Sequence, residues 1–316
     1  MEKRPRLVHE PEKTQPHLKT KFSKEKHQKV LQECEDVPEN PPVFSFPINE
    51  VGISEKTLWI KLPQGLIPFK GEITVDLPGH YKGIHMSRME NVISQLYTQP
   101  FKDIVEYATT LGDKVLKGQR AQKVQIKLEG EIPQLFKTPI SLTNSTDSVL
   151  IHCIVTLLQK REKIEKSYCL GTGVYHITAC PCTQVYNKRL FEDYDYTRST
   201  PYPTHSQRCI TWIEVETHET WPAFYQLYRC LSSCLHLSQD LLKRPDEAEL
   251  VWQCHNNPQF AEDVVRMVTQ QAGIIFRETL HPDSMVRVRT ISYESIHRHN
   301  VICMVETTLK QILAAL

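Results

Sequence analysis

Two cysteines separated by a single proline, Cys180 and Cys182, form the segment of this chain with the clearest capacity for metal chemistry. The C-x-C spacing is shorter than the C-x-x-C pairs that close structural zinc sites, and no second close cysteine pair accompanies it. One thiolate joined by imidazole and carboxylate ligands would suit Zn(II), Fe(II) or Mn(II) and would leave a position for water. An ordinary thiol is the alternative interpretation of Cys180.

Imidazole and carboxylate groups follow in three further segments. His205 lies in Pro-Thr-His-Ser-Gln-Arg, before a predicted strand, and could point back towards Cys180. Glu247 ends Lys-Arg-Pro-Asp-Glu, and Glu262 lies in an early turn of a predicted helix. Each has a simpler interpretation: a surface histidine, a solvated charged segment, and an acidic residue that favours the helix dipole.

A fifth segment, Glu-Ser-Ile-His-Arg-His, runs from Glu294 to His299. If this segment is a strand, His297 and His299 lie on the same face, because side chains alternate along a strand. The pair is then a candidate for metal binding or acid–base chemistry. Alternating surface histidines are the competing interpretation.

The order of these segments resembles the type IB GTP cyclohydrolase family, including its archaeal MptA-type branch. Cys-Pro-Cys is followed by His-x-Gln-Arg, Arg-x-Asp-Glu, Asn-Pro-x-Phe-x-Glu-Asp and Glu-Ser-Ile-His-x-His. Val-Asp-Leu-Pro and Lys-Gly-Ile-His-Met-Ser-Arg in the first half also match, so the resemblance spans residues 75–301. Thr183 and Gln184 replace the family's common Ser-Lys, and Ser206 replaces its common Asn. The 25 positions from Cys180 to His205 also exceed the spacing in bacterial members of the family. The length and the segment Thr-Ala-Cys-Pro-Cys favour the MptA-type branch.

The resemblance implies a role for each matched residue. The metal ligands would be Cys180, His205 and Glu247, and Glu262 would bind the guanine edge. The residues lining the site as catalytic groups would be Cys182, Glu294, His297 and His299. The candidates for the substrate phosphates are Lys82, Arg88 and Arg208, for which surface ion pairs are the alternative.

The implied activity is metal-dependent hydrolysis of the guanine ring of GTP at C8. Formate would be released and a 7,8-dihydroneopterin phosphate formed for pterin, folate or methanopterin-type biosynthesis. One divalent metal per subunit would lower the pKa of its bound water. The MptA-type branch favours Fe(II) and a 2′,3′-cyclic phosphate product, with Mn(II) or Zn(II) and a triphosphate product as alternatives.

Two rival hypotheses remain open from the sequence. The first is an enzyme of the same fold that acts on another purine-like ring through a cysteine nucleophile, for which metal would be dispensable. The second is a non-catalytic interaction module stabilised by metal, which would unfold when the metal is removed.

The predicted helices and strands that must position these residues indicate the α+β fold class. Alternating apolar residues predict strands at 57–62, 71–77, 123–128, 140–158, 169–179, 209–215, 285–291 and 301–308. Helical spacing predicts helices over 86–117, interrupted at Pro100, and over 221–242, and a further helix beginning at Asn257-Pro258. The resemblance implies a bimodular tunnelling fold (T-fold), with two antiparallel sheets, each with helices on one face. It also implies a homotetramer with active sites at subunit interfaces.

Composition divides the chain and limits its partners. We predict a disordered or loosely attached arm over 1–41, rich in Lys, Glu, His and Pro, then a first T-fold unit over 42–138 and a second over 139–316 that carries the metal site. A net charge of +1 argues against a dedicated nucleic-acid binder, and no apolar run approaches the roughly 18 residues of a membrane span. Ten cysteines without a secretory signal favour a reducing, cytoplasmic location.

Overall fold

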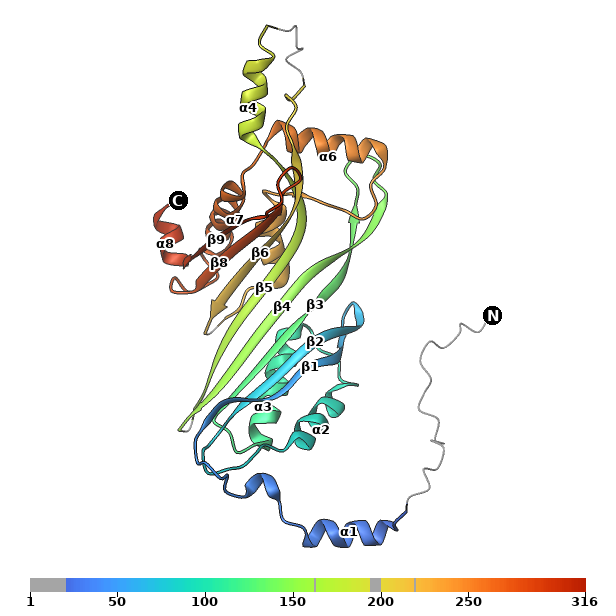
Figure 1. Cartoon of the computed structure of the whole chain (residues 1–316), viewed down its shortest axis with the longest axis vertical. Helices are drawn as coiled ribbons and strands as arrows, with labels where there is room; N and C mark the ends of the chain where they lie inside the picture. Colours follow the sequence, from blue (N-terminus) through green and yellow to red (C-terminus); the bar gives the residue numbers. More distant parts are fainter. Residues whose placement is uncertain (1–20, 162, 194–199, 219) are drawn as a thin grey trace, which may run out of the picture.

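A single antiparallel sheet organises the chain (Figure 1). The computed structural model describes residues 21–161, 163–193, 200–218 and 220–316. Within these ranges nine strands form the sheet in the order β1-β2-β3-β4-β5-β6-β8-β9, and β7 pairs with β5. The strands are β1 (Ile48–Leu62), β2 (Gly65–Leu77), β3 (Lys123–Lys137), β4 (Asn144–Lys160), β5 (Lys163–Ala179), β6 (Ser206–Thr217), β7 (His236–Leu237), β8 (Met285–Tyr293) and β9 (Val301–Thr308).

One face of the sheet is apolar along a row that crosses five strands. Residues paired in register share a face, and the row consists of Leu128, Cys153, Leu170, Val215 and Val286. All five side chains are 0% exposed. Alternation in each strand thus produces one continuous core across the sheet.

Helices cover this apolar face in two groups. Helix α3 (Ile104–Gly118) packs on β3 and β4, with α2 (Met86–Leu96) beside it. Helix α5 (Phe224–Ser232) packs on β5 and β6, and α7 (Ala261–Phe276) packs on β8 and β9. Figure 1 shows α4 (Pro181–Leu190) and α6 (Arg244–Asn256) at the end of the sheet opposite α1 (Lys24–Glu33), and α8 (Leu309–Ala314) beside α7.

Strand β5 changes its neighbour along one edge. It pairs with β4 from Lys163 to Gly173, and then with β7 at His176 and Ile177. Its other edge pairs with β6 from Tyr168 to Ala179. The β3–β4 hairpin therefore separates from β5 near one end of the sheet, where β7 takes its place.

The predicted α+β class with antiparallel strands is confirmed, but the number of sheets differs from the prediction. The family resemblance implies two sheets, whereas the long strands β3, β4 and β5 join the two groups of strands into one. The unit boundary predicted at residue 138 falls directly after β3.

Among the described helices, none has the length and apolar character needed to cross a membrane.

The predicted helix over 221–242 is wrong in its second half. Helix α5 ends at Ser232, and the chain then enters β7, which occupies the edge of β5 that β4 has left. Backbone groups at that edge need partners, and this long-range requirement overrides the local helical pattern. A separate helix, α6, begins at Arg244, where the sequence suggests only a solvated charged segment.

The beginning of α7 also differs from the predicted start at Asn257-Pro258. The helix begins at Ala261, because the Asp263 carboxylate accepts a hydrogen bond from the Phe260 backbone N–H, at 3.0 Å.

For the predicted arm over 1–41, residues 1–20 lie outside the described residues. Part of the remainder forms α1, which has no buried residue.

We expect Leu170→Ala to lower the free energy of unfolding by about 2–5 kcal/mol, because it leaves a cavity in the middle of the apolar row. Glu216→Ala is the matched control, since Glu216 lies exposed on the opposite face, next to β5. It should change stability by no more than about 0.5 kcal/mol. Urea unfolding followed by circular dichroism measures both, and equal losses would contradict the two-faced description of the sheet.

Candidate functional site

Strand pairing brings Cys180 and His205 together. Cys180 directly follows β5, and His205 directly precedes β6. Ala179 pairs with Ser206, and the Cys180 backbone N–H donates to the His205 carbonyl at 3.0 Å. Both side chains are half-buried, so a thiol and an imidazole lie at the same end of the sheet.

The β8–β9 loop adds a carboxylate and two imidazoles at this end. Strand β8 ends at Tyr293, which pairs with Arg208, so the loop begins beside β6. The His205 and His297 ring centroids are 6.3 Å apart. The rings of His297 and His299 are stacked, with centroids 5.2 Å apart and an interplanar angle of 13°. The segment is a loop and not a strand, so strand alternation does not position the two histidines, but their rings do lie side by side.

A glutamine orients the His205 ring. The Gln207 amide nitrogen donates to Thr178 Oγ1 at 3.1 Å, so its amide oxygen faces His205 Nδ1, also at 3.1 Å. His205 Nδ1 is then the donor, which leaves the Nε2 lone pair available for a metal ion. Gln207 is a functional residue that the sequence pattern did not reveal. The one signal of its role was its position two residues after His205, a candidate ligand.

Other contacts fix the surroundings of Cys180. Thr204 Oγ1 donates to the Cys180 carbonyl at 2.6 Å, and His255 Nε2 lies 3.3 Å from the Thr204 carbonyl. Ser292 Oγ donates to the Glu294 carboxylate at 2.8 Å. Cys182 is exposed in the first turn of α4, directly beyond Cys180.

Within one chain, Glu247 does not lie close to the other two predicted ligands, Cys180 and His205. It is exposed in the first turn of α6, and it lies about 12 Å along the helix from His255 at 1.5 Å per residue. Among described residues, two other groups have three metal-binding atoms within 4.8 Å of one another. One is His152, Cys169 and Glu214; the other joins Asp36 and Glu39, which follow α1, to His85, which directly precedes α2. The set of Cys180, His205 and Glu247 does not meet that distance within one chain.

The buried neighbour of Glu247, Asp246, holds α6 in place. Its carboxylate accepts hydrogen bonds from the backbone N–H groups of Ile140 and Ser141, both at 2.9 Å, and from that of Lys243. Burial alone would raise the pKa of Asp246, but the hydrogen bonds from Ser141, Ile140 and Lys243 hold it well below its usual range. The carboxylate therefore anchors the start of α6 to the turn between β3 and β4.

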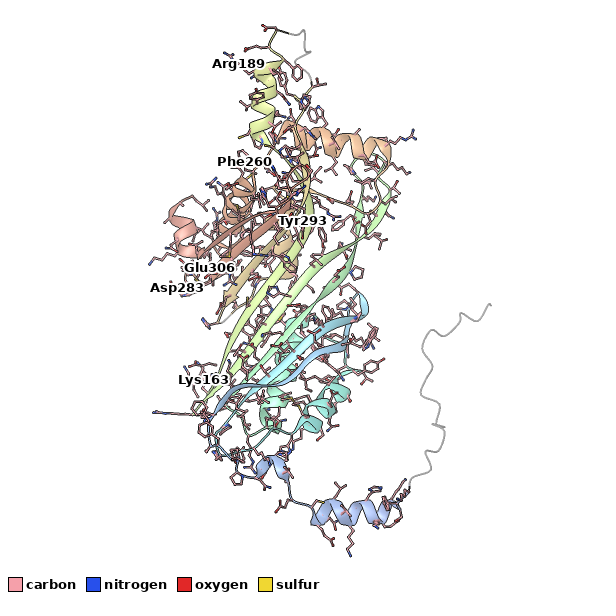
Figure 2. The ribbon with its side chains drawn as sticks, in the orientation of Figure 1. Lys163, Arg189, Phe260, Asp283, Tyr293 and Glu306 are labelled. Carbon is pink, nitrogen blue, oxygen red and sulfur yellow. The ribbon has the colours of Figure 1, made fainter. Side chains whose placement is uncertain are left out.

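Glu262 lies near the same end of the sheet as Cys180. It is exposed in the first turn of α7 and close enough to Cys303, on β9, to add to the effect of burial in raising the pKa of that thiol. In Figure 2, Phe260 and Tyr293 mark this end of α7 and β8, and Lys163 marks the other end of the sheet.

Two of the predicted phosphate-binding residues, Lys82 and Arg88, lie at that other end. Both residues follow the end of β2, which pairs with the beginning of β3. The beginning of β3 pairs with the end of β4, and the end of β4 pairs with β5 at Lys163. Strand β5 spans 17 residues from there to Cys180, or roughly 55 Å at 3.3 Å per residue. Within one chain they cannot reach a substrate bound near Cys180.

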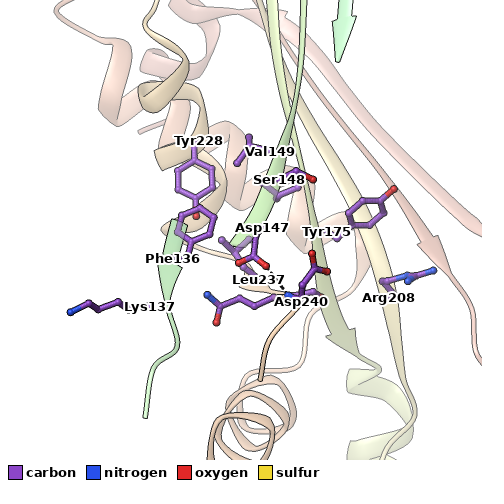
Figure 3. Close-up of a pocket in the computed structure, with 13 residues that line it drawn as sticks. Phe136, Lys137, Asp147, Ser148, Val149, Tyr175, Arg208, Tyr228, Leu237 and Asp240 are labelled. Atoms are coloured by element: carbon purple, nitrogen blue, oxygen red, sulfur yellow. Dashed lines mark hydrogen bonds between the residues drawn. The ribbon is translucent and has the colours of Figure 1, made fainter. Parts of the chain in front are cut away.

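Arg208, the third predicted phosphate-binding residue, lines a cleft of about 680 Å³ where β4 leaves β5 (Figure 3). Its guanidinium carbon lies 5.8 Å from the Tyr175 ring centroid. Stacked rings of Phe136 and Tyr228 form another wall, with centroids 5.5 Å apart. The volume falls in the range of small-molecule sites.

The donor set at this end of the sheet fits a catalytic transition metal. A thiol, several imidazoles and a carboxylate are the ligand types that Zn(II), Fe(II) and Mn(II) accept. The exposed His297 and His299 leave the outer side open to a substrate. The arrangement can therefore support hydrolysis with a bound metal and imidazole groups for proton transfer.

A buried polar chain lies beneath the site. His176 Nε2 is 2.8 Å from Thr211 Oγ1, which donates to Thr290 Oγ1 at 2.7 Å. Since Thr211 donates onward, the histidine must donate to it. Burial lowers the pKa of His176 to about 4, so this ring is neutral and links β5, β6 and β8.

Comparison of the sequence with known proteins gives one family. A model of the family described as type I GTP cyclohydrolase folE2 matches residues 34–303. GTP cyclohydrolase MptA of Methanococcus maripaludis is 27% identical over 307 residues, covering 89% of this chain and 97% of the relative. MptA of Methanocaldococcus jannaschii is 28% identical over 304 residues, covering 88% and 96%. Among solved structures, uricase from Arthrobacter globiformis has a TM-score of 0.47 at 10% identity, covering 82% and 93%.

We expect acid to destabilise the protein through His176. The unfolded pKa is about 6.5 and the folded pKa is about 4. The unfolded state therefore binds a proton first, and stability falls as pH drops from about 6.5 towards 4, by about 2 kcal/mol at pH 5. His176→Gln keeps a donor for Thr211 and removes this titration. Urea unfolding at pH 7 and pH 5 should give a smaller difference for the variant, and parallel pH dependences would contradict the assignment.

Proposed function

Because the chain belongs to the type I GTP cyclohydrolase folE2 family, we propose that it opens the guanine ring of GTP at C8 in a metal-dependent reaction that releases formate. Family membership makes the protein a GTP cyclohydrolase. The observation that supports the metal-dependent mechanism is the gathering of Cys180, His205 and the β8–β9 loop at one end of the sheet.

The proposed metal ligands are Cys180, His205 and Glu247. The contact between Cys180 and the His205 backbone and the orientation of His205 by Gln207 support the first two. The bound ion would supply a water of lowered pKa. Fe(II) is favoured, with Mn(II) or Zn(II) as alternatives, because sulfur, nitrogen and oxygen donors accept all three.

We propose that a second copy of the chain completes each site. Glu247 is exposed about two helical turns from His255, which lies at the end of α6 nearest Cys180. Lys82 and Arg88 lie at the opposite end of the sheet. A homotetramer with the T-fold architecture would place these residues at subunit interfaces. Exposed Trp59 on β1, and Ile302 and Met304 on β9, supply apolar surface on the two edge strands for such contacts.

The remaining residues take the roles that the family resemblance implies. The Glu262 carboxylate would accept hydrogen bonds from the ring N–H and the amino group of guanine, a bidentate, charge-assisted arrangement. His297 would move a proton to the opening imidazole ring of guanine, with His299, Glu294 and Cys182 beside it. Arg208 faces the cleft and would contact the phosphates.

The proposed product is a 7,8-dihydroneopterin 2′,3′-cyclic phosphate, formed for pterin-type biosynthesis. The support for this choice is that the relatives are named MptA and match nearly the whole chain. We also propose a cytoplasmic location, because every described cysteine is a free thiol.

We expect anaerobic GTP turnover with added Fe(II) to release formate and to yield a fluorescent pterin after oxidation. Cys180→Ala should lower this activity at least 100-fold, because it removes a proposed metal ligand, and a chelator should do the same. The product mass distinguishes cyclic phosphate from triphosphate. Activity that survives chelation would favour the cysteine-nucleophile hypothesis, and unfolding on chelation without any turnover would favour the non-catalytic module.

We expect Glu247→Gln to abolish activity, whereas Glu249→Gln on the same helix should retain it. If two chains form each site, reassembling Cys180→Ala with Glu247→Gln subunits should restore roughly a quarter of the sites by random pairing. Formate release by the mixture measures this recovery. No recovery, when wild-type subunits reassemble with full activity, would show that one chain supplies all the ligands.

A further inference from the structure

The face of the sheet opposite the helices carries a row of charged and polar residues. One register step from the apolar row, the paired residues are Glu129, His152, Gly171, Glu214 and Arg287. Cys169, two residues before Gly171 on β5, lies on the same face. An imidazole, a thiol and a carboxylate from three adjacent strands therefore share one small area.

The three donor groups are close enough to bind one ion. Cys169 Sγ lies 4.0 Å from His152 Nε2, and His152 Nδ1 lies 3.8 Å from a Glu214 carboxylate oxygen. One ligand atom from each residue falls within 4.8 Å of the others. Ligands around a tetrahedral zinc ion are roughly 3.3–3.6 Å apart, given bonds of about 2.0–2.3 Å. Small side-chain rotations would bring the three atoms to that separation.

A glycine provides the space in which these side chains meet. Gly171 pairs with both His152 and Glu214, so it lies directly between them. A Cβ atom at position 171 would lie 2.5 Å from His152 Cε1 and 3.1 Å from Glu214 Cγ. Any other residue would push the imidazole and the carboxylate apart.

Neighbouring side chains orient the donors. Arg287 donates to one Glu214 oxygen at 2.8 Å, which leaves the other oxygen facing His152. The Trp212 ring lies 5.7 Å from the His152 ring, centroid to centroid. His152 and Glu214 also line a hollow of about 490 Å³, through which an ion can enter. Outer contacts of this kind fix ligands at metal sites.

We propose that His152, Cys169 and Glu214 form a second divalent transition-metal site, which links β4, β5 and β6 on the open face of the sheet. Cys169 precedes Cys180 by 11 residues of extended chain, or roughly 35 Å, so the two sites are separate. Thiolate, imidazole and carboxylate ligands favour Zn(II), with a fourth position left for water.

The acid–base state of the donors agrees with this assignment. Burial lowers the pKa of His152, so its ring is neutral and has a lone pair to donate. Burial, with a further effect from Glu214, raises the pKa of Cys169 to about 12, so the metal-free thiol is protonated. Formation of the metal–sulfur bond would release that proton to solvent as the thiolate forms.

The test is metal binding by the full-length protein, without GTP. After equilibration with micromolar Zn(II) and gel filtration, we expect two ions per chain for the wild type, by mass spectrometry of the metal. Cys180→Ala and Cys169→Ala should each bind one, and the double variant none. Cys303→Ala is the control and should keep both, because Cys303, also half-buried, belongs to no three-residue donor group among described residues.

A second measurement separates metal binding from misfolding. Gly171→Ala leaves all three donors in place and should weaken binding at this site at least tenfold, with an unchanged circular dichroism spectrum. Zn(II) should raise the melting temperature of Cys180→Ala, but not that of Cys180→Ala/Cys169→Ala. One ion per chain in the wild type that survives Cys169→Ala, or binding of the second ion only at millimolar Zn(II), would overturn the proposal. Neither result depends on GTP hydrolysis.

Discussion

The alternation of side chains through strands paired in register is the constraint on which the rest of this structure depends. The row from Leu128 to Val286 is completely buried under helices, and the row one residue away is charged. A slip of one residue in β5 would move Leu170 to the open face and separate Cys180 from His205. The apolar core therefore sets the register, and the register positions the chemical groups.

Local sequence patterns predict much of this arrangement. Alternation identifies the strands, and Pro100 correctly separates α2 from α3. The sequence also places Cys180 and His205 beside predicted strands, so their meeting requires only that those strands pair. The end of α5 and the presence of α6 were missed, because β7 fills an edge vacated by β4 and Asp246 binds a turn 105 residues earlier in the chain. Such distant partners leave no local periodicity.

The same limit applies to side chains that meet across several strands. His152, Cys169 and Glu214 have no motif spacing, and only the pairing of β4, β5 and β6 brings them together. The one sequence signal for this cluster was Gly171, because a glycine within a strand marks a place where neighbouring groups approach closely. Gly171 and Gly173 lie within the predicted strand over 169–179. Their partners, His152 and Trp212, become visible only with the register.

The connection between β6 and β8 has a consequence for the order of folding. From β1 to β6, each strand pairs with its neighbour in the chain, whereas Cys209 pairs with Ser292, 83 residues later. Closing that long loop carries the largest entropic cost, so the hairpins of β1 to β6 can form before β8 is in place. The β8–β9 loop with Glu294 and His297 thus arrives late. A nascent chain would have most of its sheet before it had all the residues of the proposed active centre.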